Sequence, residues 1–416
     1  MFKSFLSRRL KVRVAFCVLG GVGVLNSAFA IQVTFTKIAD TSTTAPEGSL
    51  FSGFDSAPAI SGSNVVFEAG ATTADGIFTA TTSGTAITKI ADTTDSLPGH
   101  SPFAIMGSFP VISGNNVSFF GAYNFSTPAG AICTGTVGQT GFTKLVDTSD
   151  SVLTNGNSFF TPQISLQSIS GNNVAVSVDT TNSFGVYNGT VGVPGVSKFV
   201  GKGNVSADNV TFIDADAGGV SGNNVVFHGN YSGGSGVFTG TLGSTVFSKV
   251  ISTADTAPGH TAFTRFDATS ISGNNVAVVG EWSSGSGIYA GIAGTAGVTK
   301  IVDTTDFGNK YSSFSSVIAS GNEIAFQADS GGIDNIIVES GGNFFTIITD
   351  NTPLFGHNFS DSITLGGFDA ATNTIAFSYR QGGVTGIASA TFVLPEPATL
   401  CIFSLIPVMA MRRLRK

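Results

Sequence analysis

One short pattern recurs along the chain at an almost constant interval, and it constrains the fold more than any other feature. The pattern is a Ser-Gly-Asn-Asn-Val unit whose successive serines are 52, 57, 51, 51 and 48 residues apart. Six copies begin at Ser61, Ser113, Ser170, Ser221, Ser272 and Ser320, and a weaker seventh covers residues 372–375. Gly and Asn tolerate the positive φ of tight turns, so each copy predicts a turn that leads into a strand.

Each repeat carries signals for four short strands. The strand after the turn alternates large and small apolar residues, as in Val65-Val66-Phe67, which indicates that both of its faces are buried. The next strand opens with Gly, as in Gly76-Ile77-Phe78, and the one after it carries a lysine, as in Thr88-Lys89-Ile90. A further apolar segment precedes each turn, as in residues 263–271. Four short antiparallel strands in roughly 51 residues match one blade of a β-propeller.

The number and phase of the repeats predict a closed ring. Seven repeats of roughly 51 residues fill the 364 residues from 31 to 394. The first lysine strand, residues 33–40, has no turn unit before it, and the last turn unit has no lysine strand after it. We therefore expect an all-β fold, a seven-bladed β-propeller of four-stranded blades whose ring is closed by the N-terminal strand. The lysine strands should form the outer blade edges, where lysine discourages pairing with other chains.

The first thirty residues have the composition of a secretory signal peptide. A basic stretch and an apolar run lead to Ala28-Phe29-Ala30, the small-x-small pattern that signal peptidase accepts, so cleavage is expected at Ala28 and Ala30. A retained N-terminal membrane helix is the alternative, but the apolar run is short for a span. The predicted domains are thus a signal peptide at 1–30, the propeller at 31–394 and a C-terminal signal at 395–416.

The C-terminal signal has three parts. Pro395-Glu396-Pro397 comes first and marks the start of the predicted helix, because proline cannot continue a helix towards its N-terminus. The apolar run from Ala398 to Met411 follows, and as a helix it spans roughly 21 Å, short of a bilayer core of roughly 30 Å. A basic tail ends the chain and should stay cytoplasmic, which places the body outside the inner membrane. The tail residues are Arg412, Arg413, Arg415 and Lys416.

This combination of motif, apolar run and basic end resembles the PEP-CTERM sorting signal of Gram-negative bacteria. The resemblance covers about 22 of 416 residues. It implies processing by an exosortase, transient attachment to the inner membrane through a short C-terminal membrane helix, and delivery to the cell surface or to an extracellular polysaccharide matrix. A plain C-terminal membrane anchor is the alternative. The resemblance assigns no activity to the propeller body.

The charge of the body excludes one class of partner. Residues 31–394 hold 10 basic and 25 acidic residues, a net charge of −15. An anionic body repels nucleic acid, so we expect no nucleic-acid partner. Cys133 is the body's single cysteine, which rules out an intrachain disulfide there.

Polar loops follow the lysine strands and offer the only candidate metal ligands. Their aspartates could bind Ca²⁺ through oxygen, although the spacing fits no EF-hand loop, and Asp and Thr also cap turns for local reasons. No other cofactor is expected. The candidates are Asp92, Asp95, Asp147, Asp150, Asp303 and Asp306. Three histidines, His100, His260 and His357, follow Gly in these loops, but they belong to different blades and are not expected to converge on one metal.

Catalytic motifs do not appear in the sequence. The Gly-x-Ser-x-Gly elbow is absent, and glycine-rich stretches lie between strands rather than before helices. The leading hypothesis is therefore a non-enzymatic surface or matrix protein, with no catalytic residues, that binds a glycan or a protein partner. A secreted propeller enzyme acting on polysaccharide, with paired carboxylates near the axis, is the alternative. A purely structural matrix component is a third.

Overall fold

Each Ser-Gly-Asn-Asn unit folds into a two-residue turn between the innermost strand of a blade and its neighbour. In the fourth repeat Ser221 pairs with Asn224 across the strands, and Gly222 between them has a φ of 58°. Positive φ at the first central residue is the mark of a type II′ turn, which suits the twist of a hairpin and favours Gly. The predicted turn and the strand after it are therefore confirmed.

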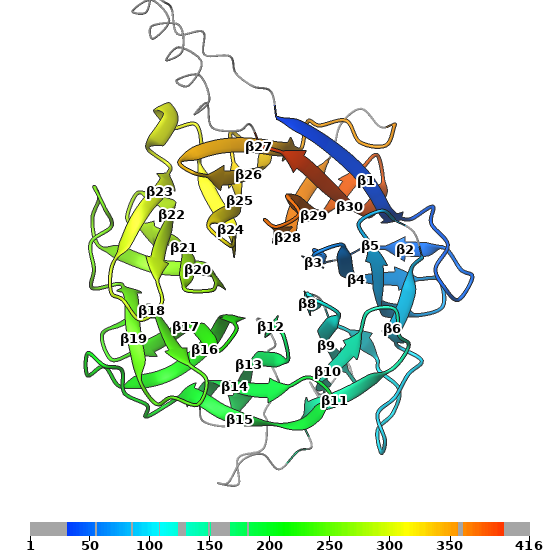
Figure 1. Ribbon diagram of the computed structural model, residues 1–416, viewed down its shortest axis with the longest axis horizontal. Helices are drawn as coiled ribbons and strands as arrows, with labels where there is room; N and C mark the ends of the chain where they lie inside the picture. The colour runs from blue at the N-terminus through cyan, green and yellow to red at the C-terminus, as the bar shows by residue number, and fades with distance from the viewer. Residues whose placement is uncertain are drawn as a thin grey trace, which may run out of the picture. The chain divides into compact units, whose positions relative to one another are not determined.

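The computed structural model describes residues 31–394 except 55, 85, 108, 124–129, 149, 151–166, 181–182 and 357–360. Its strands form seven antiparallel sheets around one axis (Figure 1). Blades 1 to 3 are built from β2 (Phe51–Gly53), β3 (Ala59–Ser61), β4 (Asn64–Ala71), β5 (Asp75–Thr81) and β6 (Thr88–Asp92); β7 (Ile105–Met106), β8 (Val111–Ser113), β9 (Asn116–Ala122), β10 (Gly130–Thr136) and β11 (Phe142–Asp147); and β12 (Gln167–Ser170), β13 (Asn173–Thr180), β14 (Ser183–Thr190) and β15 (Val193–Gly201).

Blades 4 to 7 complete the ring. They are built from β16 (Phe212–Ser221), β17 (Asn224–Tyr231), β18 (Gly234–Thr241) and β19 (Phe247–Ser252); β20 (Phe263–Ser272), β21 (Asn275–Trp282), β22 (Gly285–Ile292) and β23 (Val298–Asp303); β24 (Ser313–Ser320), β25 (Glu323–Asp329), β26 (Asp334–Ser340) and β27 (Asn343–Thr349); and β28 (Ser362–Asp369), β29 (Thr374–Gln381), β30 (Val384–Val393) and β1 (Gln32–Asp40). A short 3-10 helix, η1 (Asp306–Gly308), follows β23.

In blades 1 and 2 the innermost strand is broken into two pieces, β2 with β3 and β7 with β8. Pro58 lies just before β3 and Pro110 just before β8. Proline has no N–H to give to the ladder, so the strand is interrupted there. The other five blades have four continuous strands each. The outermost strand carries a lysine in every blade except blade 6, whose β27 has none (Figure 1).

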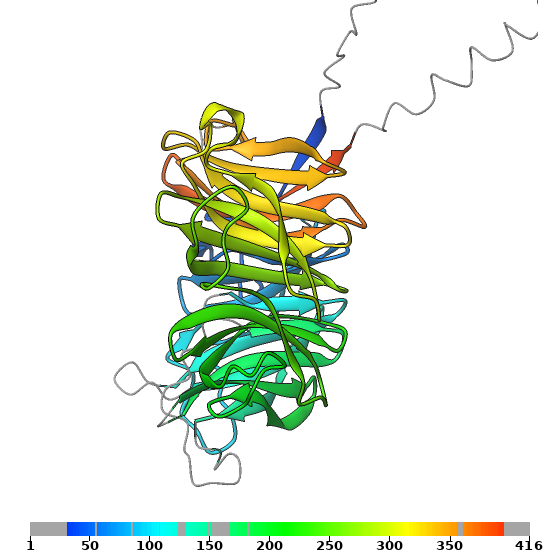
Figure 2. The ribbon, with the colours of Figure 1, turned by 90° about the vertical axis from the view of Figure 1, so that its left-hand side faces the viewer.

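The ring is closed by the N-terminal strand. β1 pairs antiparallel with β30 along its length, from Gln32 opposite Val393 to Asp40 opposite Gly386. Figure 2 shows the two strands side by side at one edge of the ring. The predicted completion of the last blade by the first strand is confirmed.

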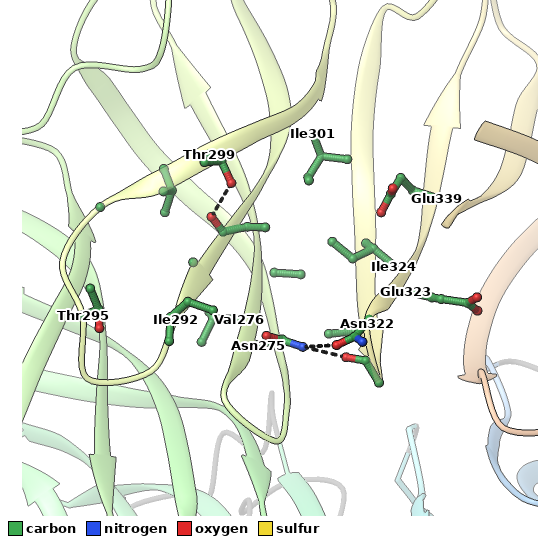
Figure 3. A pocket seen from close by; sticks show the side chains of 17 residues that line it. Asn275, Val276, Ile292, Thr295, Thr299, Ile301, Asn322, Glu323, Ile324 and Glu339 are labelled. Carbon is green, nitrogen blue, oxygen red and sulfur yellow. Dashed lines mark hydrogen bonds between the residues drawn. The ribbon is translucent and has the colours of Figure 1, made fainter. Parts of the chain in front are cut away.

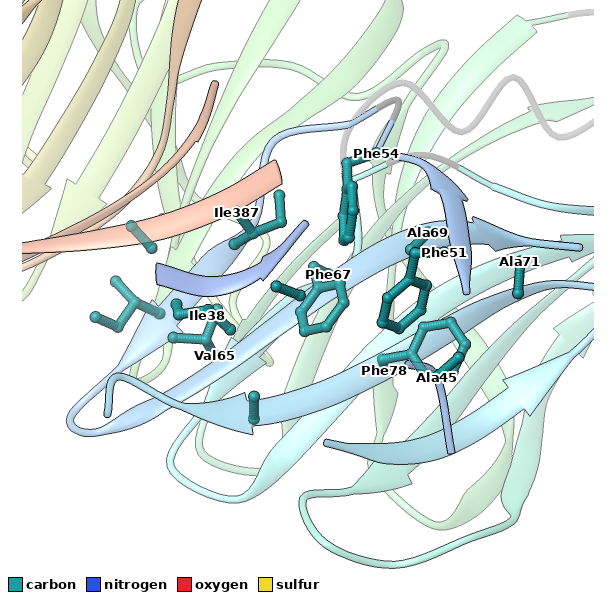
Figure 4. Close-up of a cluster of buried hydrophobic side chains, with 14 residues drawn as sticks. Ile38, Ala45, Phe51, Phe54, Val65, Phe67, Ala69, Ala71, Phe78 and Ile387 are labelled. Carbon is teal, nitrogen blue, oxygen red and sulfur yellow. The ribbon is translucent and has the colours of Figure 1, made fainter. Parts of the chain in front are cut away.

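The hydrophobic core is divided among the interfaces between blades. At the junction of blades 7 and 1, Ile38 and Ile387 pack with Phe67 and Phe78 (Figure 4). The Phe51 and Phe78 rings meet edge to face with centroids 5.1 Å apart, a favourable geometry for aromatic pairs. This core therefore joins the first and last blades by packing as well as by strand pairing.

The predicted processing signals lie outside the described residues. These are Ala28 and Ala30 at one end and Pro395, Glu396, Pro397 and the basic tail at the other. The expected C-terminal membrane helix falls there too. Within the part of the chain that the structure describes, no helix is long and apolar enough to cross a membrane.

Candidate functional site

The ring has two rims with different chemistry. We call the rim formed by the Ser-Gly-Asn-Asn turns the turn rim, and the opposite rim, where loops leave the lysine strands, the loop rim. At the turn rim each blade accepts a hydrogen bond from the next, as Ser221 Oγ does from Gly273 N–H at 2.8 Å. The seven acceptors are Ser61, Ser113, Ser170, Ser221, Ser272, Ser320 and Asp369.

The second Asn of the unit adds a ladder of amide hydrogen bonds. Asn224 Nδ2 donates to Gly273 O at 3.2 Å and to Asn274 Oδ1 at 2.8 Å. The same pair of bonds occurs at Asn64, Asn116, Asn173 and Asn275. Blade 6 has Glu323 at this position and blade 7 has Thr374, so the ladder stops there. The recurring motif thus serves to join blades.

At the loop rim the candidate metal ligands are held by internal partners. Asp303 accepts hydrogen bonds from Lys300 Nζ at 2.9 Å and from Thr305 Oγ1 at 2.6 Å, and its side chain is fully buried. Asp306 Oδ2 accepts the Asp303 N–H at 2.9 Å, which is turn capping. Burial alone would raise the pKa of Asp303, but hydrogen bonds from Thr305, His260 and Lys300 hold it well below its usual range.

The other two loops repeat this arrangement. Lys89 contacts Asp92 at 2.8 Å and Asp95 at 3.5 Å, and Lys144 contacts Asp147 at 2.9 Å and Asp150 at 2.6 Å. Among the described residues no group of three or more His, Cys, Asp or Glu side chains is placed to hold a metal ion. All six carboxylates therefore already have lysine contacts or backbone donors.

Two of the loop histidines occupy equivalent stacked positions. His100 lies on Tyr123 with ring centroids 4.3 Å apart, and His260 lies on Trp282 at 4.1 Å, both within 11° of parallel. His260 Nε2 also contacts Asp303 Oδ2 at 2.9 Å, and the equivalent distance from His100 to Asp147 is 3.3 Å. These two histidines stand in blades 2 and 5 and do not converge. The third, His357, lies outside the described residues.

The nearest approach to a catalytic carboxylate pair is on blade 5. A β-bulge between Phe266 and Thr269 turns Asp267 out of the ladder beside Glu281, and Arg265 Nε lies 3.1 Å from Asp267 and 2.7 Å from Glu281. Burial and the neighbouring Glu281 raise the pKa of Asp267, whereas the Arg265 hydrogen bond lowers that of Glu281. One guanidinium thus bridges the two carboxyls, unlike the separated carboxyls of a glycosidase.

A cleft of about 450 Å³ opens at the turn rim between blades 5 and 6 (Figure 3). Its walls are mainly aliphatic and come from β21, β22 and β23 on one side and β24, β25 and β26 on the other. The aliphatic lining includes Ala290, Ile292, Val298, Ile301 and Ile324. Smaller hollows of about 310 and 200 Å³ lie at the matching junctions of blades 2 and 3 and of blades 4 and 5.

One side chain distinguishes this junction from the other six. In each blade one residue of the third strand lies opposite the apolar residue that follows the turn, and in six blades it is small: Ala80, Gly135, Gly189, Gly240, Gly291 and Ala390. At the four glycines an apolar side chain of the preceding lysine strand packs onto this position; a Cβ at Gly291 would lie only 2.6 Å from Val250 Cγ1. Blade 6 has Glu339 at this position. Its partner Ile301 stays half-buried, whereas Val250 is fully buried.

Glu339 brings a carboxylate into the cleft. Its side chain extends from β26 towards Ile301, whereas Glu323 extends away from the cleft (Figure 3). Glu339 is 8% exposed, and its Oε1 accepts the Gly342 N–H at 2.7 Å. No described residue donates a hydrogen bond to Oε2. Glu323 Oε1 accepts from Ser340 Oγ at 2.7 Å.

This site was not predicted from the sequence, in which the turn motif and the loops after the lysine strands are the most regular features. The signal lies instead in a broken regularity, because aligning the seven repeats on their turns places Glu339 among glycines and alanines.

Comparisons with known proteins agree with the fold. The β-propeller domain of the Trilobed protease from Pyrococcus furiosus has a TM-score of 0.53 and 11% identity over 82% of this chain and 98% of that one. A prolyl endopeptidase has a TM-score of 0.53 and 10% identity over 82% of this chain and 50% of that one. This chain therefore spans half of that enzyme.

These likenesses show the fold alone. The archaeal domain is described as having an open velcro topology, whereas here β1 and β30 close the ring by hydrogen bonding. No protein-family model matches the sequence, and no curated protein matches it. The chain is thus a seven-bladed β-propeller.

Proposed function

We propose that this chain is an exported, non-enzymatic binding protein. In this proposal it is sorted through Pro395-Glu396-Pro397 and the tail that follows, and it holds a partner at the cell surface or in the extracellular matrix through the cleft between blades 5 and 6. The binding part of the proposal rests mainly on Glu339, a carboxylate that stands where other blades have a small residue and that faces an open apolar cleft.

The chemistry of the cleft supports binding rather than catalysis. Its lining includes no histidine, cysteine, lysine or arginine, and Glu339 is the one carboxylate that points into it. A nucleophile would need a base within hydrogen-bond reach, and a glycosidase would need a second carboxyl. An apolar hollow with few polar groups is the usual form of a ligand site.

The export part of the proposal rests on the sequence signals at the two ends of the chain. Gln32 and Val393 are paired in the last blade, so the predicted cleavage site at Ala30 and the motif at Pro395 are each two residues from the same strand end. Signal peptidase and exosortase, the proposed processing enzymes, would both act beside the strand pair that closes the ring.

A retention assay tests this function. The full chain is produced in a Gram-negative host that has an exosortase, and the mature protein is measured on cells and in the medium. We expect wild type on the cell surface and in the matrix, and Glu339→Gly mostly in the medium, because the glycine lets Ile301 close the cleft.

Glu323→Gln is the matched control, since that side chain points away from the cleft. Equal retention of wild type and Glu339→Gly would refute binding through the cleft. Replacement of Pro395-Glu396-Pro397 by alanines should leave the tail attached, as seen by the mass of the protein. Normal processing of that variant would refute the sorting role.

A further inference from the structure

We infer that the cleft between blades 5 and 6 receives a lysine side chain of a partner polypeptide. The inference rests on the proposed binding function and names its ligand. The lysine methylenes would lie along the aliphatic wall of Ile292, Val298 and Ile301, and the ammonium would meet the carboxylate of Glu339.

Charge favours a cationic ligand. The body carries a net charge of −15, and no described lysine or arginine forms an ion pair with Glu339. The nearest lysine in sequence on the facing strand, Lys300, is held at the loop rim by Asp303 and Asp306, each at 2.9 Å. A largely buried carboxylate that has no cation beside it is stabilised when a partner brings an ammonium group.

The hydrogen-bonding state of Glu339 favours lysine over arginine. Oε1 is already engaged by Gly342, which leaves Oε2 as the free acceptor. A guanidinium binds a carboxylate best through two parallel hydrogen bonds to both oxygens, whereas an ammonium is a compact charge that one oxygen can receive. The cleft therefore offers a single point of attachment.

Two other polar side chains of the cleft are already engaged and are not free to bind a sugar. Thr299 donates its hydroxyl to Ala290 O at 3.3 Å, and the Asn275 amide donates to Gly321 O and Asn322 Oδ1 (Figure 3). A sugar would need many free donors and acceptors. The aliphatic walls instead match the four methylenes of lysine, whose stem packs on apolar surface while its head stays charged.

Calorimetry with residues 31–394 tests the inference. The probe is the peptide acetyl-Ala-Lys-Ala-amide, compared with versions that carry acetyl-lysine, norleucine or arginine. We expect binding of the lysine peptide and at least a tenfold loss of affinity for each of the others. Glu339→Gln should lose at least tenfold for the lysine peptide, and Glu323→Gln should bind as wild type does. Circular dichroism checks that both variants fold.

Four outcomes would overturn the inference. Arginine binding as tightly as lysine would contradict the single attachment point. Norleucine or acetyl-lysine binding equally would show that the charge is irrelevant, and cadaverine binding as tightly as the peptide would assign the cleft to free amines. No binding of any peptide, with the cell-surface retention intact and dependent on Glu339, would reject lysine while leaving the proposed function standing.

Discussion

Gly62 in the first turn of the ring donates its backbone N–H to Asp369 of the last turn, with N and Oδ2 2.6 Å apart. The other six junctions of the turn rim use a serine hydroxyl as acceptor. The closing junction therefore has a charged acceptor, and hydrogen bonds to charged groups are about twice as strong as neutral ones.

Asp369→Ala should weaken the ring at this junction. We expect the free energy of unfolding to fall by about 2 kcal/mol, because a charge-assisted hydrogen bond contributes about 1.5–3 kcal/mol. Urea unfolding of residues 31–394 measures it. Ser221→Ala removes a neutral bond within the ring and should cost about 1 kcal/mol. An equal loss in both variants would contradict a special role for the closing junction.

Removal of residues 31–40 should destabilise the whole body. The deletion strips β1 from β30, exposes a sheet edge and removes Ile38 and Ala39 from the core between blades 7 and 1. We expect a large drop in the thermal unfolding midpoint, measured by calorimetry. Removal of residues 395–416 is the control. A truncated chain as stable as that control would show that closure by β1 adds nothing.

Acid should weaken the cluster around Asp303. The pKa of Asp303 is lowered in the folded chain. Its contribution to the free energy of unfolding is therefore present above the ordinary pKa of about 4 and is lost as the pH falls below that value. Asp303→Asn should cost about 3 kcal/mol at pH 7, because it leaves Lys300 and His260 without their buried partner. Guanidinium unfolding should show that the difference in unfolding free energy between wild type and Asp303→Asn narrows between pH 5 and pH 2. A gap independent of pH would contradict the assignment.

An exchange of residues between blades tests the origin of the cleft. Gly291→Glu puts a side chain where Val250 packs, and we expect a loss of about 2 kcal/mol from overpacking. Glu339→Gly restores the usual residue and should change stability by no more than about 1 kcal/mol, the usual cost of a strand glycine. Thermal unfolding compares them. Similar losses in both would mean that Glu339 does not hold the blades apart.

Calcium should have no effect on stability. The aspartates of the loop rim already face lysines, turn N–H groups and hydroxyls. We expect the same midpoint of thermal unfolding in excess Ca²⁺ and in EDTA, because an ion that binds only the folded state would raise that midpoint. A calcium-dependent rise that Asp303→Asn abolishes would establish a site in these loops.

The fold was predictable because each repeat carries local sequence signals for its turn and its strands. The turn needs positive φ at Gly222 and its counterparts, and the phase of the strands requires Gln32–Asp40 to complete blade 7. What each Ser and Asn of the motif does was not predictable. Their partners lie about fifty residues away in the next blade, and only the geometry of the ring brings them together.

The cleft was harder to predict for a physical reason. Whether a strand can approach its neighbour depends on the pair of residues at positions such as Ile301 and Glu339, which are 38 residues apart. A single glutamate on a strand looks like an ordinary solvent-facing residue. It becomes informative only when the seven repeats are compared, because its six counterparts are glycine or alanine.

The antiparallel pairing of Gln32 with Val393 also determines how the body bears mechanical force. A pull on the C-terminal end of β30 acts along that strand, so its hydrogen bonds to β1 and β29 are loaded together in shear. The same pull on the N-terminal end of β1, which is an edge strand, loads only its hydrogen bonds to β30. A body tethered through its C-terminal end alone would thus resist flow and drag through its stronger attachment.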